Sequence, residues 1–334
     1  MRLFICLLLA ASFAAAEPLR MNHVQVVGTH NSYHLRPDEP YFSSLLQFEP
    51  RAAAWDYDHL PLDQQLSNGV RNLELDIFYH PLEEGGPSRF RVYHVPRLDP
   101  NSLCETVGAC FRTVKQWSDA NPNHVPISIL LELKEGFREL LTPPATRTIE
   151  NEDLQRLDEI VTGIFGDSLL TPDDVRGDAA TLEQAITTRG WPLLDAVRGK
   201  VMVVMHETGR LRDAYVEGHP SARGRPMFVQ GVPGRPEAAF LIMNNPHDER
   251  IPELVRQGYI IRTRADSELR EARDNDTGRR EAAKASGAHV VTTDFPPGQA
   301  HEDTGYVVQF DDAGRAQRCN PVTAPPGCAD EQVE

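Results

Sequence analysis

Residues that can bind a metal ion or transfer protons end most of the apolar runs in this sequence. The first such run is VVGTHNSY (26–33), which places His30 next to Asn31. The polar residues found at such positions are His30, Asn31, Glu74, Asp76, His94, Glu132, Lys134, His206, Asn244, Asn245, Arg262, Arg264, Asp266, Thr293 and Asp294. When strands are parallel, their carboxyl ends meet on one side of the fold and form its binding site. We therefore look for the chemistry among these residues.

Four of them offer oxygen ligands to a hard cation. Glu74 and Asp76 are two residues apart, so a strand directs both side chains to the same face. The same alternation pairs Glu132 with Lys134. Clustered carboxylates repel one another unless a positive charge lies among them. Together with the amide of Asn31 they form an all-oxygen set, which predicts a Ca²⁺ site rather than a Zn²⁺ site.

His30 and His94 flank this predicted metal site and could act as acid–base groups or stabilise a phosphoryl group. The competing interpretation is that the acidic residues are rim charges paired with basic neighbours. Other histidines carry weaker signals. His206 and His247 lack the spacing of a helical zinc pair and are interpreted as rim or supporting groups. The polar-loop histidines His59, His124 and His219 are predicted to have no chemical role.

Eight short apolar runs alternate mostly with helix-length polar stretches, and they must position these residues. The runs cover residues 23–30, 70–79, 90–95, 126–133, 200–206, 238–244, 258–264 and 288–295. Helices are predicted at 61–68, 102–120, 151–165, 181–189 and 268–287, a long loop at 36–58 and a weak helix within 207–224. This order predicts an α/β fold, a single-domain (β/α)₈ TIM-type barrel, with a doubly wound open sheet as the alternative.

The ends of the chain indicate an exported protein. A basic start, an apolar run and three consecutive alanines predict a signal peptide over residues 1–16, too short to span a membrane. We then expect a barrel domain at 17–310 and a C-terminal extension at 311–334. Four cysteines remain after cleavage, and local pairing predicts the disulfides Cys104–Cys110 and Cys319–Cys328. The net charge of −15 argues against nucleic-acid binding. We expect a secreted or periplasmic monomer.

Six segments, in order, resemble the secreted calcium-dependent phosphatidylinositol-specific phospholipases C of bacteria. They are VVGTHNSY (26–33), GVRNLELDIFY (69–79), VYHVP (92–96), ILLELKE (129–135), YIIRTRAD (259–266) and HVVTTDFP (289–296). The resemblance implies Ca²⁺ ligands at Asn31, Glu74, Asp76 and Glu132, catalytic histidines at His30 and His94, and Glu74 as an alternative base. It also suggests Lys134 and Arg264 as contacts to the substrate phosphate or inositol.

The implied reaction is attack of the inositol 2-hydroxyl on its own phosphodiester, which releases diacylglycerol and a cyclic inositol phosphate. The substrate would be a phosphoinositide or a related phosphodiester lipid at a membrane surface. YFSSLLQF (41–48) could enter the bilayer, although a buried loop anchor is the favoured interpretation. Glycerophosphodiester phosphodiesterases and sphingomyelinase D-like enzymes are enzymatic alternatives, and a non-catalytic binding barrel is a third. His30-Asn31-Ser32 and His94-Val95 differ from the His-Arg-Gly and His-Asp that the phosphodiesterases show.

Overall fold

Eight parallel strands form a closed barrel. The computed structural model describes residues 17–80, 90–135 and 148–334, so the predicted signal peptide lies outside the described residues. The barrel strands are β1 (Val24–Thr29), β2 (Asn72–Tyr79), β4 (Ile127–Leu133), β5 (Val201–Met205), β6 (Phe228–Val229), β7 (Phe240–Ile242), β8 (Ile260–Arg264) and β9 (Val290–Thr293). They are ordered β6-β5-β4-β2-β1-β9-β8-β7, and a parallel bridge from Gln230 to Phe240 joins the two ends. The predicted (β/α)₈ barrel is confirmed.

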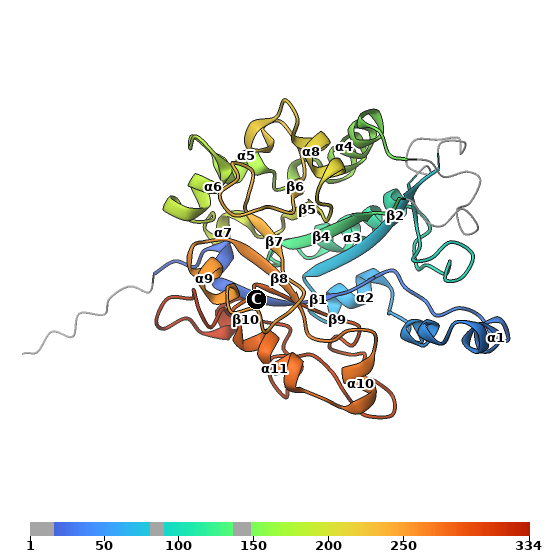
Figure 1. Ribbon diagram of the computed structural model, residues 1–334. Coiled ribbons are helices and arrows are strands. Elements are labelled where there is room, and N and C mark those ends of the chain that lie inside the picture. Colours follow the sequence, from blue (N-terminus) through green and yellow to red (C-terminus); the bar gives the residue numbers. More distant parts are fainter. Residues whose placement is uncertain (1–16, 81–89, 136–147) are drawn as a thin grey trace, which may run out of the picture.

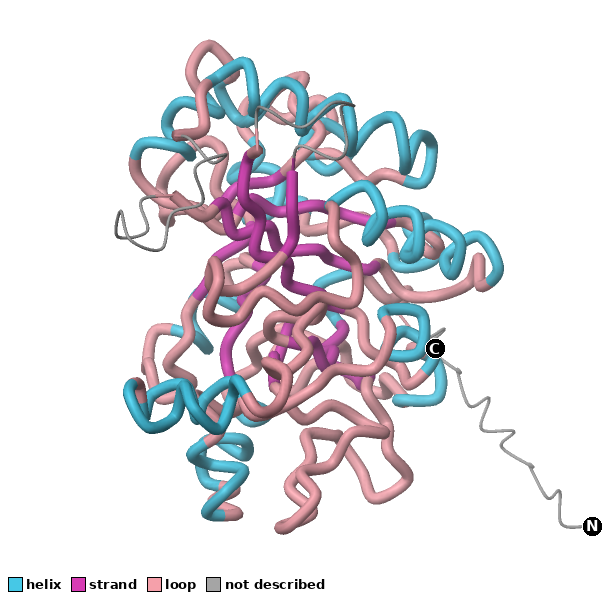
Figure 2. Tube along the Cα trace, turned by 90° about the vertical axis from the view of Figure 1, so that its right-hand side faces the viewer, coloured by secondary structure: helices cyan, strands magenta, loops and turns pink. Residues whose placement is uncertain are grey.

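Helices surround these strands, as Figures 1 and 2 show. The α-helices are α1 (Tyr41–Phe48), α2 (Leu62–Ser67), α3 (Val107–Ala120), α4 (Asn151–Phe165), α5 (Pro172–Arg176), α6 (Leu182–Gln184), α7 (Leu194–Val197), α8 (Arg210–Val216), α9 (Ile251–Arg256), α10 (Arg270–Asp274) and α11 (Gly278–Ala285). Leu73, Leu75 and Ile77 of β2 pack in one core cluster with Phe111 of α3 and Leu157 of α4. This outward-facing apolar side of β2 is what directs its acidic residues into the barrel. No helix in the described parts of the chain is long and apolar enough to cross a membrane.

One predicted barrel strand was wrong. The run at 90–95 forms the short β3 (Phe90–Val92), which pairs antiparallel with β2 and lies off the barrel path. Only residues 80–89 separate β2 from β3, whereas a parallel crossover needs a dozen residues or more. The missing barrel strand is β6, whose two residues were too few to stand out in the sequence.

The long segment predicted as a loop at 36–58 is also more regular than expected. It contains α1 and the 3₁₀ segment η2 (Pro50–Trp55), and α1 lies at the edge of the molecule, away from the barrel (Figure 1). The predicted helix at 268–287 is divided into α10 and α11. The division falls at Asn275. This residue has a left-handed conformation, with a φ of 50°, and α10 ends there.

The C-terminal extension is fastened to the bottom of the barrel. Both predicted disulfides are present, Cys104–Cys110 and Cys319–Cys328. The strand β10 (Gln317–Cys319) pairs antiparallel with the first half of β1. Glu334 forms an ion pair with the buried guanidinium of Arg71, in which Nε and Oε2 are 2.9 Å apart. The boundary near residue 310 stays a prediction.

Candidate active site

The four predicted calcium ligands come from neighbouring strands. Asn31 follows β1 in a left-handed conformation with a φ of 46°. The next residue clamps this turn to β2, since Ser32 N donates to Glu74 O at 2.9 Å and Glu74 N donates to Ser32 Oγ at 2.8 Å. On β2 and β4, Asp76 and Glu132 are paired across the parallel ladder. The structure therefore brings Asn31 and the three carboxylates to adjoining positions.

Charge in this cluster is only partly balanced by protein groups. Glu74 and Arg262 form a fully buried ion pair. Lys134 Nζ lies 2.6 Å from Glu132 Oε1 and 3.1 Å from Asp76 Oδ2. Burial of Asp76 is still strong enough to raise its pKa above the ordinary range. For Glu132, His206 and Lys134 outweigh burial and lower its pKa.

Asp76 provides the structural test of whether a cation fits. Both of its carboxylate oxygens are buried, and the Lys134 ammonium 3.1 Å from Oδ2, which is shared with Glu132, is not oriented for a hydrogen bond to either oxygen. A buried carboxylate with so little compensation is costly, and a bound cation removes that cost. The ligand set contains only oxygen, which suits Ca²⁺. These residues fit a calcium ion.

His30 lies at the end of β1 between a carboxylate and a guanidinium. Its Nδ1 is 2.9 Å from Asp294 Oδ1, and its Nε2 is 3.3 Å from Nη1 of Arg264. Burial, followed by the charge of Arg264, lowers the pKa of His30, and Asp294 opposes them. A lowered pKa favours the neutral imidazole, which is the form that can accept a proton. Beneath it, His59 Nε2 donates to the carbonyl oxygen of His30 at 2.9 Å.

His94 is held by a second carboxylate, on the loop that follows β3. Its Nδ1 lies 2.7 Å from Asp99 Oδ2, and the same oxygen lies 2.9 Å from Nε2 of His34. Asp99 and His34 are fully buried, while the side chain of His94 is 23 % exposed. The hydrogen bonds from both histidines outweigh burial and lower the pKa of Asp99, which keeps it an anion.

Both histidines open onto one cleft of about 760 Å³ at the carboxyl ends of the strands. Its lining includes the predicted site residues His30, Asn31, His94 and Arg264. The segment η2 forms another wall with Ala53, Ala54 and Trp55, and the Trp55 ring meets His94 edge-on at 5.7 Å between centroids. Glu74 is close enough to His30 for its negative charge to oppose, in part, the lowering of the pKa of that histidine by burial and Arg264.

Some supporting residues were missed or misjudged in the sequence. Asp294 was among the polar residues recognised at strand ends, but no role was assigned to it. Asp99 and His34 lie in loops without any pattern that marks them. His59 and His124, which were predicted to have no chemical role, are buried and hydrogen-bonded; the absence of a chemical role stays a prediction. His206 lies beside Glu132, with Nδ1 3.5 Å from Oε2.

Lys134 and Arg264 differ in their access to a substrate. Arg264 lines the cleft beside His30 and Asp294. The ammonium group of Lys134 is held between Asp76 and Glu132. Both substrate contacts stay predictions, and the geometry favours Arg264.

A comparison with protein-family models gives a match over most of the chain. The model of the Ca²⁺-dependent phosphoinositide phospholipase C family matches residues 19–88 and 82–321. No curated protein sequence matches the chain.

Solved structures are similar over most of their length. A calcium-dependent phosphoinositol-specific phospholipase C from a Gram-negative Pseudomonas species is 21% identical, with a TM-score of 0.60 over 90% of this chain and 95% of that one. The same enzyme in a myoinositol complex is 20% identical, with a TM-score of 0.60 over 90% of this chain and 95% of that one. A Ca²⁺-dependent phosphatidylinositol-specific phospholipase C from Streptomyces antibioticus is 19% identical, with a TM-score of 0.56 over 83% of this chain and 95% of that one. These structures support the barrel fold.

The family match covers nearly the whole described barrel, and it does not favour the glycerophosphodiesterase, sphingomyelinase D-like or non-catalytic alternatives. The chain belongs to the family of Ca²⁺-dependent phosphoinositide phospholipases C, which are phosphodiesterases.

Proposed function

We propose that this protein cleaves phosphatidylinositol into diacylglycerol and a cyclic inositol phosphate. The observation that carries the proposal is the pair His30 and His94, which line one cleft and are each hydrogen-bonded to a buried carboxylate. A base on one side and an acid on the other are what an intramolecular attack with an alkoxide leaving group requires. Asn31, Glu74, Asp76 and Glu132 would hold the calcium ion, which supplies Lewis-acid stabilisation of the phosphate and lowers the pKa of the attacking hydroxyl.

His30 is the base in this proposal. It takes the proton of the inositol 2-hydroxyl as that oxygen bonds to phosphorus, and the carboxylate of Asp294 stabilises the imidazolium that forms. Glu74 is a poorer candidate, because it is fully buried in an ion pair with Arg262 and is one of the proposed calcium ligands. Arg264, beside His30, would stabilise the negative charge of the phosphate in the transition state.

His94 is the acid. Asp99 accepts from Nδ1 of His94 and so fixes the ring, and no hydrogen bond to Nε2 is seen from the described residues. We infer that Nε2 donates a proton to the glycerol oxygen as its bond to phosphorus breaks. The products are then neutral diacylglycerol and the cyclic phosphodiester. His30 releases its proton to water and His94 takes one up from water, which resets both histidines.

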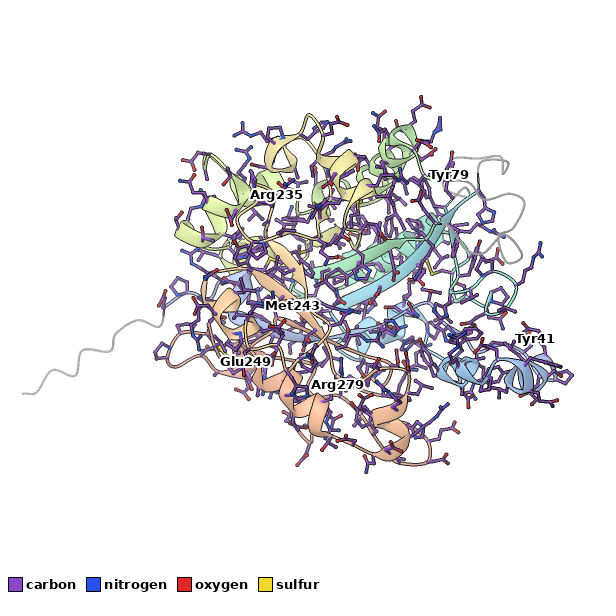
Figure 3. The ribbon with its side chains drawn as sticks, viewed as in Figure 1. Tyr41, Tyr79, Arg235, Met243, Glu249 and Arg279 are labelled. Atoms are coloured by element: carbon purple, nitrogen blue, oxygen red, sulfur yellow. A yellow bond between two sulfur atoms is a disulfide. The ribbon has the colours of Figure 1, made fainter. Side chains whose placement is uncertain are left out.

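We infer that the protein acts at a membrane surface and is secreted or periplasmic. Phe42 and Leu45 of α1 are buried, which supports the interpretation of this segment as an anchor. Two other side chains of this helix are exposed, Phe48 (86 %) and Tyr41 (41 %), and Figure 3 labels Tyr41 at the outer edge of the molecule. Because α1 is followed directly by the cleft wall η2, an exposed aromatic face here would bring the cleft to a lipid surface.

Phosphorus NMR tests the proposal. Purified mature protein is incubated with phosphatidylinositol in vesicles, with Ca²⁺ or with a chelator. A cyclic phosphodiester resonance that appears only with Ca²⁺ supports the reaction. Cleavage of glycerophosphoinositol while the intact lipid is ignored would refute it.

The variant Phe48→Ser tests the role of α1. Its binding to vesicles is expected to fall, while its activity on a short-chain soluble substrate is expected to stay unchanged.

A further inference from the structure

His34 and His94, which share the carboxylate of Asp99, have an unusual hydrogen-bonding pattern. Nδ1 of His34 lies 3.0 Å from the carbonyl oxygen of Tyr57, and Nε2 lies 2.9 Å from Asp99 Oδ2. A neutral imidazole carries a hydrogen on only one nitrogen, so it can donate to only one of these acceptors. As a donor to Asp99, Nε2 of a neutral ring leaves the lone pair of Nδ1 facing the Tyr57 carbonyl oxygen. A metal ion bound between Nε2 and Asp99 would let Nδ1 donate to that carbonyl instead.

The hydrogen bonding of Asp99 also indicates a cation site. Its Oδ2 is shared between two histidine nitrogens, and its Oδ1 is buried without a hydrogen-bond partner in the described parts of the chain. The side chains of Asp99 and His34 are both 0% exposed. A fully buried carboxylate with an unsatisfied oxygen is the kind of group that a metal ion neutralises.

From these contacts, we propose that His34, His94 and Asp99 form a binding site for a divalent transition-metal ion such as Zn²⁺, separate from the calcium site. Two imidazole nitrogens and one carboxylate oxygen are a usual Zn²⁺ ligand set, with a fourth position left for water. The Tyr57 carbonyl completes it, because zinc-binding histidines typically donate their other N–H to such an acceptor. Calcium, which prefers oxygen ligands, would not compete well here.

The geometry needs little adjustment. The three ligand atoms lie within 4.8 Å of one another. Tetrahedral Zn²⁺ with bonds of about 2.0–2.1 Å places its ligand atoms about 3.3 Å apart. The two shortest separations, 2.7 and 2.9 Å, must therefore widen by roughly half an ångström. His94 can move, since it is at the cleft surface, while His34 is fixed by stacking on Tyr57 at 4.3 Å between centroids.

Zinc at this site would inhibit the enzyme. A His94 ring bound to Zn²⁺ through Nδ1 cannot also be an imidazolium, so it loses its strength as a proton donor. The binding of zinc stands on the three residues alone, whereas inhibition rests on the proposed function of His94.

Calorimetry on the full mature protein tests the binding. The protein is freed of metals, saturated with Ca²⁺ and titrated with Zn²⁺, and Co²⁺ replaces Zn²⁺ in a parallel absorption experiment. We expect Zn²⁺ to bind in the presence of Ca²⁺ and Co²⁺ to give the intense visible bands of a four-coordinate site. Absence of binding, or displacement of Zn²⁺ by additional Ca²⁺, would overturn the proposal.

Variants assign the site. Asp99→Asn, His34→Gln and His94→Gln should each weaken Zn²⁺ binding by at least about 10- to 100-fold, the loss seen when even an outer partner of a metal ligand is removed. His94→Gln is the safest of these for folding, since its side chain is partly exposed. His206→Gln, beside the calcium carboxylates, is the control and should leave Zn²⁺ affinity unchanged. Equal loss in the control would refute the assignment.

The activity assay separates this inference from the proposed function. With Ca²⁺ saturating, Zn²⁺ should slow release of the cyclic phosphate at concentrations that match its binding curve. Zinc binding in a protein that turns over no phosphatidylinositol would refute the proposed function and leave the zinc site intact. Inhibition that survives in His34→Gln would place the inhibitory zinc elsewhere and overturn the inference.

Discussion

Replacement of Asp294 by asparagine tests the role of His30 most directly. Asp294 Oδ1 lies 2.9 Å from His30 Nδ1, and the carboxylate side chain is only 2 % exposed. Asparagine keeps the size of the side chain and an oxygen that can accept a hydrogen bond. It removes the negative charge that would stabilise an imidazolium during proton transfer. The substitution therefore changes electrostatics with little change in packing.

The size of the effect follows from the charge separation. Two unit charges about 4 Å apart at an effective dielectric constant of about 20 interact by about 4 kcal/mol. If this stabilisation exists only when His30 is protonated, its loss raises the barrier by a similar amount and slows kcat by about 10³-fold. Arg264, whose guanidinium is 3.8 Å from Asp294, stays in place and disfavours the imidazolium further. KM should change little, because the effect belongs to the transition state.

The assay is initial-rate release of the cyclic phosphate at saturating Ca²⁺, with Ca²⁺ affinity and melting temperature measured on the same preparations. Asp153→Asn, which alters another buried carboxylate in α4 outside the barrel, is the matched control and should affect stability alone. If folded Asp294→Asn retained more than about a tenth of the wild-type kcat, His30 would not be a base assisted by this carboxylate.

Four further changes have defined outcomes. Asp76→Asn should weaken Ca²⁺ binding at least about 10-fold by calorimetry; because the pKa of Asp76 is raised, wild-type affinity should also rise with pH, and a flat profile would contradict this. His94→Ala should abolish turnover of phosphatidylinositol yet spare a nitrophenyl ester, whose leaving group needs no proton; equal loss on both would refute its role as acid. Glu334→Gln leaves buried Arg71 without its carboxylate and should lower the free energy of unfolding by about 3 kcal/mol in urea titrations. The buried His289, with its pKa lowered to about 4, must stay neutral to fold; stability should be full above pH 6.5 and fall by up to about 3 kcal/mol toward pH 4, and His289→Gln should remove that slope.

The order of apolar runs and helix-length polar stretches was enough to predict the barrel. The alternation of apolar and polar residues within a strand predicted the direction of its acidic side chains. In β2, Leu73 and Leu75 occupy the outer face, so Glu74 has no alternative but the inner one. The ladder then places Asp76 opposite Glu132 without any contribution from loops. Sequence reasoning succeeds here because a strand has only two faces and one of them must meet the helices.

Prediction failed where short elements or tertiary contacts decide the structure. The β-rich run at 90–95 looks like its neighbours, and only the brief connection from β2 shows that it cannot be a parallel strand. The two residues of β6 carry almost no periodicity. The burial of the loop histidines also depends on tertiary contacts. His59 lies between Asp58 and Leu60 in the sequence, and the turn after β1 folds over it.

The turn at residues 30–34 explains why a strand should end in a histidine and an asparagine. Three residues of this turn contact different partners: His30 faces Asp294, which follows β9, Ser32 joins β2, and His34 contacts Asp99 next to His94. Asn31 can adopt the left-handed conformation that reverses the chain, which few other residues that offer an oxygen ligand tolerate. The proposed base, a calcium ligand and the support of the proposed acid thus share one rigid turn, so their relative positions are fixed by local chain geometry rather than by distant packing.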